Sequence, residues 1–190
     1  MEKQKLEEQL KQGQQIPTLP ECIAYLLIVI SVTIFLFFIS DYFWLRAWTT
    51  LGAGGILELF GAGTTVTINS MTGLVTIEGF SVIKICSGIE AIALVSGLII
   101  ATPTTWKRKV GGVLFISFGI FFANMLRIVT TVVLSRQGFE PFIYHEVVSA
   151  IFTIVFIIVF ILMIQAWIIP NFIDSLINIL VGIVRAIKGS

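Results

Sequence analysis

Four long apolar segments divide the chain. Residues 22–40, 87–103, 111–134 and 147–169 consist largely of Ile, Leu, Val and Phe. About 20 consecutive apolar residues are needed for a helix to cross the ~30 Å of hydrocarbon in a bilayer. The pattern therefore predicts an all-α polytopic membrane protein with about four transmembrane helices.

Two shorter patterns occupy residues 41–85, between the first two spans. Residues 45–60 are apolar with several glycines and predict an interfacial helix that the glycines weaken. Residues 64–69 and 73–78 alternate Thr with Val and Ile, which is typical of half-buried strands. They predict a small extracytoplasmic β-hairpin. Because an isolated hairpin is marginal in water, we expect it to rest on the helices.

The two ends of the chain are more polar than its middle. Residues 1–21 contain Pro17 and Pro20 and predict a cytosolic leader. Residues 171–190 repeat polar side chains at spacings of three, four and seven, which predicts an amphipathic helix in the inner interface. The expected organisation is thus a leader, a membrane domain over residues 22–170, and an interfacial tail.

Composition agrees with a membrane protein and excludes some functions. Of the 190 residues 57% are hydrophobic and only 12% are charged, whereas soluble domains keep about a quarter charged. A net charge of +1 without a long basic tract argues against a nucleic-acid partner. One histidine and two cysteines without Cys-x-x-Cys spacing are too few ligands for zinc, so we expect no metal and no other cofactor.

The distribution of lysine and arginine predicts the orientation. Eight basic residues lie in the leader, the 104–110 turn and the tail, against three in the opposite loops. Cytoplasmic loops carry the excess of basic residues, so both termini should face the cytoplasm of a plasma membrane. The eight are Lys3, Lys5, Lys11, Lys107, Arg108, Lys109, Arg185 and Lys188, and the three are Arg46, Lys84 and Arg136.

This topology brings three reactive residue types to the outer half of the membrane. Cys86 opens the second span and His145 precedes the fourth. Arg127 lies eight residues before Ser135 in the third span, about 12 Å below its outer end at 1.5 Å per residue. A thiol, a guanidinium and an imidazole can serve as nucleophile, anion stabiliser and proton carrier in acyl transfer. Taken singly, the cysteine and the histidine are more often packing residues.

The arginine inside a span needs a partner or a wet cavity, because inserting it costs at least ~2.5–3.5 kcal/mol. Asn124, one turn earlier on the same face, could hydrogen-bond it. Two interpretations remain open for Arg127: an anion clamp, or a structural ion pair with Glu90. Ser87 and Gly88 are small and would let a substrate backbone approach.

Three motifs together resemble the exosortase/archaeosortase family of multi-spanning membrane transpeptidases. They are CSGIE at residues 86–90, NMLRI at residues 124–128 and the histidine that opens the last span. The resemblance covers roughly residues 45–165. It implies that Cys86 is the nucleophile, that Arg127 stabilises the transition state and that His145 is the acid and base. The chain is shorter than many bacterial members.

The same resemblance implies the substrate. The family cuts a C-terminal sorting signal of exported proteins, made of a short motif, a transmembrane helix and a basic cluster, and transfers the new C-terminus to a lipid or envelope acceptor. A thioester acyl-enzyme would be the intermediate. We expect the hairpin to grip the motif by strand addition. Alternatives are an intramembrane cysteine protease that only hydrolyses, and a non-enzymatic small transporter or scaffold subunit.

Overall fold

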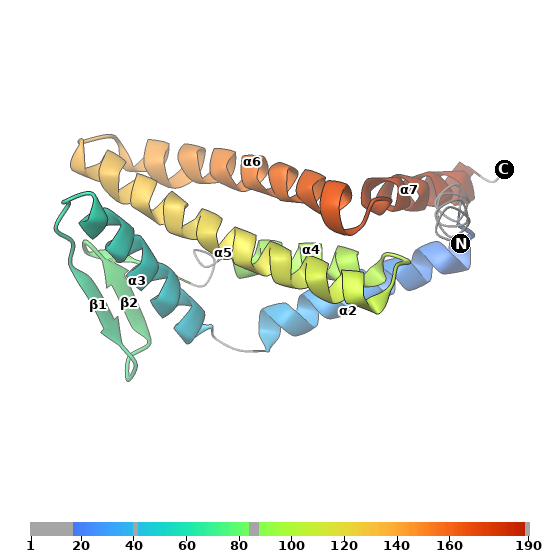
Figure 1. The fold of residues 1–190 in the computed structure, drawn as a ribbon, viewed down its shortest axis with the longest axis horizontal. Coiled ribbons are helices and arrows are strands. Elements are labelled where there is room, and N and C mark those ends of the chain that lie inside the picture. Colours follow the sequence, from blue (N-terminus) through green and yellow to red (C-terminus); the bar gives the residue numbers. More distant parts are fainter. Residues whose placement is uncertain (1–16, 40–41, 84–87, 189–190) are drawn as a thin grey trace.

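The computed structural model describes residues 17–39, 42–83 and 88–188, apart from the side chain of His145. Most of these residues are helical, and the helices form an elongated bundle (Figure 1). The helices are α2 (Leu19–Phe38), α3 (Phe43–Leu59), α4 (Ile89–Ala101), α5 (Trp106–Arg136), α6 (Val148–Met163) and α7 (Phe172–Lys188). Two π-helical segments, Ile143–Val147 and Ile164–Ile168, flank α6.

Helix α5 is the axis of the molecule. Its 31 residues extend about 46 Å at 1.5 Å per residue. It packs against α4, α3 and α6. Figure 1 shows α6 running along α5, with α2 and α4 toward one end and α3 and the sheet toward the other. Residues from distant parts of the sequence therefore meet on α5.

Three helical stretches are long and apolar enough to cross a membrane: α2, α5 and the continuous stretch Val148–Ile168. They confirm three of the predicted spans by length and composition. Helix α4 has only 13 residues, or about 20 Å. It begins after Gly88 in a left-handed conformation and ends where Thr102, before Pro103, becomes extended. The span predicted over residues 87–103 therefore stays a prediction.

The predicted hairpin is present but belongs to a larger sheet. Strands β1 (Val66–Asn69), β2 (Leu74–Ile77) and β3 (Phe80–Ser81) form an antiparallel sheet in the order β1-β2-β3. Our sequence analysis missed β3. The connection between β2 and β3 is Glu78-Gly79, and both residues have positive φ, 51° and 80°, as a two-residue type I′ turn requires. An acidic residue followed by glycine was the signal for this turn.

Helix α3 buries one face against α5 and the sheet, and its interfacial position stays a prediction. A Cβ on Gly52 would lie 2.1 Å from Sδ of Met125 on α5, and a Cβ on Gly54 would lie 2.9 Å from Cγ2 of Val66. The glycines that we expected to weaken this helix therefore let it approach α5 and β1. A shared apolar cluster joins α3, the sheet and α5: Ala53, Leu57, Val75, Ile77, Val82, Ile128 and Val132.

Helix α7 returns to the start of the bundle. Its Gly182 lies against Cys22 of α2, and Cys22 Sγ is 3.7 Å from the carbonyl oxygen of Ile179. Figure 1 shows α7, the start of α2 and the α4–α5 connection at one end, opposite the sheet. The charge pattern predicted this grouping of elements. The compartment that each end faces, and the interfacial position of α7, stay predictions.

Candidate functional site

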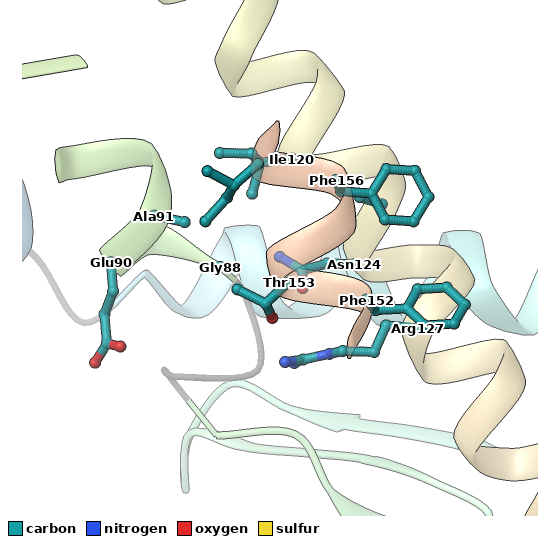
Figure 2. Close-up of a pocket in the computed structure, with 11 residues that line it drawn as sticks. Gly88, Glu90, Ala91, Ile120, Asn124, Arg127, Phe152, Thr153 and Phe156 are labelled. Atoms are coloured by element: carbon teal, nitrogen blue, oxygen red, sulfur yellow. The ribbon is translucent and has the colours of Figure 1, made fainter. Parts of the chain in front are cut away.

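Two polar side chains of α5 line a cavity between α4, α5 and α6. Asn124 and Arg127 are three residues apart, so they lie on the same face of the helix. The cavity has a volume of about 110 Å³. Asn124 is 7% exposed, and Arg127 is half-buried. Figure 2 shows both side chains extending from α5 toward the start of α4.

Gly88 forms the opposite side of this cavity, immediately before α4. Its φ is 72°, a left-handed conformation that favours glycine. A Cβ at this position would also lie 1.8 Å from Nδ2 of Asn124 and 2.9 Å from Cγ2 of Ile120. Backbone conformation and lack of space therefore both require glycine here. We expected the small size of Gly88 to let a substrate backbone approach. In the structure, the group that lies beside Gly88 is the amide of Asn124.

Helix α6 closes the cavity with residues that our sequence analysis missed. Phe152 and Phe156 are one turn apart, with ring centroids separated by 5.6 Å, and Thr153 lies between them in sequence. Aromatic residues at i and i+4 mark a common helix face. In a span that is apolar throughout, however, the spacing does not reveal which face meets α5.

A second cavity, of about 530 Å³, lies between the sheet and the helices. Arg127 lines this cavity as well as the first. Its guanidinium-bearing side chain is therefore shared by a small cavity inside the helices and a larger one beside the strands. The other lining residues are Ile77, Phe80, Ser81, Val82, Ile83, Ile128, Thr131, Val132, Glu146 and Ser149.

The chain that leaves β3 is held on both sides at Val82. The backbone N–H of Val82 donates to the carbonyl oxygen of Val75 at 2.8 Å, and Arg46 Nη1 donates to the carbonyl oxygen of Val82 at 3.3 Å. Arg46 is only 8% exposed, and its guanidinium lies 6.0 Å from the centroid of the Phe43 ring. We had counted Arg46 only as a loop cation. It is a buried group that holds the chain in place where it leaves β3.

A charged contact joins the sheet to the end of α5. Arg136 Nη2 lies 3.2 Å from Glu78 Oε1, which also accepts a 2.8 Å hydrogen bond from the backbone N–H of Thr65. The hydrogen bond from Thr65, and then the nearby Arg136, lower the pKa of Glu78 below its ordinary value. The ionised form of Glu78 is therefore the form that holds the β2–β3 turn against α5.

Comparison with known protein families identifies the architecture. The family model described as transmembrane exosortase matches residues 16–165, well over half of the chain. The chain belongs to the transmembrane exosortase family. The match spans both cavities and the motifs on which the resemblance was based. Neither the search of curated proteins nor the search of solved structures found a match.

Two of the three expected catalytic residues of this exosortase lie beyond what the structure describes. Cys86 and the neighbouring Ser87 are outside the described residues, as is the side chain of His145. The backbone of His145 belongs to the π-helical segment Ile143–Val147. Single π-turns occur frequently at functional sites. The convergence of Cys86, Arg127 and His145 stays a prediction.

Glu90 does not form the structural ion pair that we considered for Arg127. It lines the first cavity at its edge, and its side chain is exposed. Figure 2 shows its carboxylate apart from the guanidinium of Arg127. The interpretation of Arg127 as a partner of Glu90 therefore loses its support.

Two polar groups of the first cavity, Arg127 and Asn124, suit an oxygen-bearing anion, and the carboxylate of Glu90 lies at its edge. A guanidinium only donates hydrogen bonds, and an amide nitrogen donates two. Over the described ranges no group of three or more His, Cys, Asp and Glu side chains is arranged to hold a metal ion. The chemistry available to Arg127 and Asn124 is the stabilisation of negative charge on oxygen.

Proposed function

We propose that this exosortase is a membrane-embedded cysteine transpeptidase. It cleaves a C-terminal sorting signal of exported proteins and joins the new C-terminus to a lipid or envelope acceptor. Family membership supports a membrane protein with a sorting-related transpeptidase role. The nucleophile, the signal and the acceptor belong to the proposal.

One observation carries the proposal: Arg127 lines both cavities, and residues 84–87, which include Cys86, connect the two cavities in sequence. Ile83 lines the cavity beside the sheet, and Gly88 lines the cavity inside the helices. Cys86 is one of the four residues between these two positions. Consecutive Cα atoms are about 3.8 Å apart, so a four-residue connection is a short one. This neighbourhood supports Cys86 as the nucleophile that acts beside Arg127.

The reaction has two steps. The thiolate of Cys86 attacks the scissile carbonyl carbon, an S–C bond forms, and the carbonyl electron pair moves to the oxygen. The C–N bond then breaks, and His145 gives a proton to the departing amine, which leaves a thioester. The acceptor nucleophile attacks the thioester, His145 takes its proton, and the thiolate is released. Arg127 stabilises the negative oxygen in both steps.

The two cavities support different parts of substrate binding. We propose that the motif of the sorting signal lies extended beside β3, which is an edge strand of the described sheet and lines the larger cavity. The transmembrane helix of the signal then lies in the lipid against the outer surface of α6. Exposed apolar side chains cover that surface: Ile151, Ile154, Val155, Ile158 and Leu162.

We propose that both termini are cytoplasmic and that the site faces the extracytoplasmic side. The excess of lysine and arginine in the leader, the 104–110 turn and the tail supports this orientation. The common location of α7, the start of α2 and the α4–α5 connection is consistent with it (Figure 1).

The chain's two cysteines provide a matched test of the nucleophile. Cys86→Ala should leave an exported reporter that carries such a signal uncleaved, although the enzyme is expressed normally. Cys22 is fully buried between α2 and α7, so Cys22→Ala should process the reporter as the wild type does. The readout is the size of the reporter in membranes that contain equal amounts of enzyme.

Normal processing by Cys86→Ala would overturn the proposed nucleophile. Mass spectrometry of the product then tests whether the new C-terminus is transferred to an acceptor. An added group at the new C-terminus supports transfer, whereas a free carboxylate in the presence of envelope acceptors contradicts transfer and shows hydrolysis.

A further inference from the structure

A buried amide at the cavity has no partner among the described residues. Nδ2 of Asn124 is inaccessible to solvent and makes no hydrogen bond within the described part of the chain. Most buried polar groups are hydrogen-bonded, so an exception of this kind requires an explanation. Asn124 lines the cavity that also contains Arg127, which indicates that the missing partner is a ligand of the cavity.

The surrounding structure holds the amide in this position. Gly88 provides the space, because any side chain there would overlap Nδ2. The first turn of α4 lies beside it, since Gly88, Glu90 and Ala91 line the same cavity. The first N–H groups of a helix have no partner within the helix and favour negative charge. The amide, the guanidinium and the start of α4 therefore surround one small space in which a negatively charged oxygen would be stabilised.

We propose that Asn124 is a catalytic residue whose Nδ2 donates a hydrogen bond to the oxyanion of the tetrahedral intermediate. The inference rests on the proposed function, in which the thiolate of Cys86 adds to the scissile carbonyl. As the S–C bond forms, the carbonyl electron pair moves to the oxygen, and this oxygen accepts hydrogen bonds from Asn124 and Arg127. When the C–N bond breaks, the electron pair returns and the carbonyl of the thioester is formed. Asn124 itself neither gains nor loses a proton.

Two substitutions remove the donor and preserve the shape of the side chain. Asn124→Leu replaces the amide with methyl groups, and Asn124→Asp replaces the N–H donors with an acceptor. Ser96→Ala is the matched control. Ser96 is fully buried on α4, its Oγ also lacks a partner within the described residues, and it does not line the cavity. All three are made in the Cys22→Ala background, so that Cys86 is the only thiol.

Four measurements on the purified proteins separate catalysis from folding. They are kcat and KM for the reporter, the thermal unfolding temperature in detergent, and the rate at which iodoacetamide alkylates Cys86. Removing one oxyanion donor lowers kcat by about 10²–10³-fold. We expect this loss in both Asn124 variants with KM little changed. Alkylation forms no oxyanion, so its rate should equal that of the parent. Asn124→Leu removes an unpaired buried group and should not unfold at a lower temperature.

The inference is overturned if Asn124→Leu keeps the kcat of the parent. It is also overturned if the loss of kcat is accompanied by a lower unfolding temperature and slower alkylation, or if Ser96→Ala shows the same loss, because the effect would then be structural. Cys86→Ala in the same assay tests the proposed function separately from the role of Asn124. If Cys86→Ala still processes the reporter, the proposed function is wrong. If Cys86→Ala is inactive but Asn124→Leu is active, only the proposed role of Asn124 is wrong.

Discussion

A single missing Cβ determines the geometry of the candidate site. Gly88 belongs to the CSGIE motif, and the sequence suggested that its small size admits a substrate backbone. In the structure the amide of Asn124 occupies the space beside it. The glycine of one motif and the asparagine of the other, 36 positions later (124 − 88), are thus a complementary pair. Both residues line the cavity between α4, α5 and α6.

Alanine substitutions at two glycines test this contact. Gly61 and Gly88 have the same φ of +72°, but a Cβ on Gly61 would meet nothing within 4 Å. Gly61→Ala should cost only the left-handed backbone, about 1–2 kcal/mol. Gly88→Ala should cost about 1–3 kcal/mol more through overpacking and should abolish processing. Denaturant unfolding in detergent and the reporter assay measure both effects. Equal losses in the two variants would contradict the contact with Asn124.

At the scale of elements, the sheet is attached to α5 through both apolar and charged contacts. The cluster of α3, β2 and α5 residues buries the apolar side of the sheet. Glu78 ties the β2–β3 turn to the last residue of α5, because its carboxylate contacts both Thr65 and Arg136. Ile77, Val82 and Val132 of the apolar cluster also line the cavity beside the sheet.

The charge of Glu78 should make this attachment depend on pH. Because its folded-state pKa is lowered, the stability it contributes is present above the ordinary carboxyl value of 4.5 and is lost as the pH falls through the lower folded value. The wild type should therefore lose more thermal stability between pH 5 and pH 3 than Glu78→Gln does. Glu58→Gln, at an exposed position of α3, is the control and should behave as the wild type. Identical pH profiles for wild type and Glu78→Gln would contradict the role of the carboxylate.

At the scale of the whole molecule, the length of α5 separates two environments. A helix of about 46 Å is longer than the ~30 Å of hydrocarbon in a bilayer. The C-terminal part of α5 packs against α3 and the sheet, whereas the basic residues Lys107, Arg108 and Lys109 lie in its first turn. We expect the sheet to project on the extracytoplasmic side.

Cysteine labelling measures this orientation. In a background with Cys22→Ala and Cys86→Ala, Met71→Cys places a thiol on the tip of the hairpin, where Met71 is 97% exposed. Lys188→Cys places one at the end of α7. A membrane-impermeant maleimide should label Met71→Cys in intact spheroplasts and should label Lys188→Cys only after permeabilisation. The reverse pattern would place the candidate site on the cytoplasmic side.

The sequence by itself determined where the helices and the first two strands lie. In lipid, each backbone N–H and C=O must find a partner within the protein, and a helix satisfies them within its own segment, so a long apolar run favours a helix. The period-two pattern of Thr, Val and Ile determined β1 and β2 in the same local way. Arg127 could also be selected from sequence alone, because an arginine in an apolar span has few structural explanations.

Only the tertiary structure decided which residues share a cavity. Helical periodicity specifies the face on which a side chain lies, but the packing of α4 and α6 on α5 selects its neighbours. Gly88 precedes α4, Asn124 lies on α5 and Phe156 lies on α6, and no local pattern relates them. The burial of Arg46 beneath the strand exit likewise depends on contacts between α3 and Val82. Local spacing therefore predicts elements, whereas a site made of residues distant in sequence requires the packing of those elements.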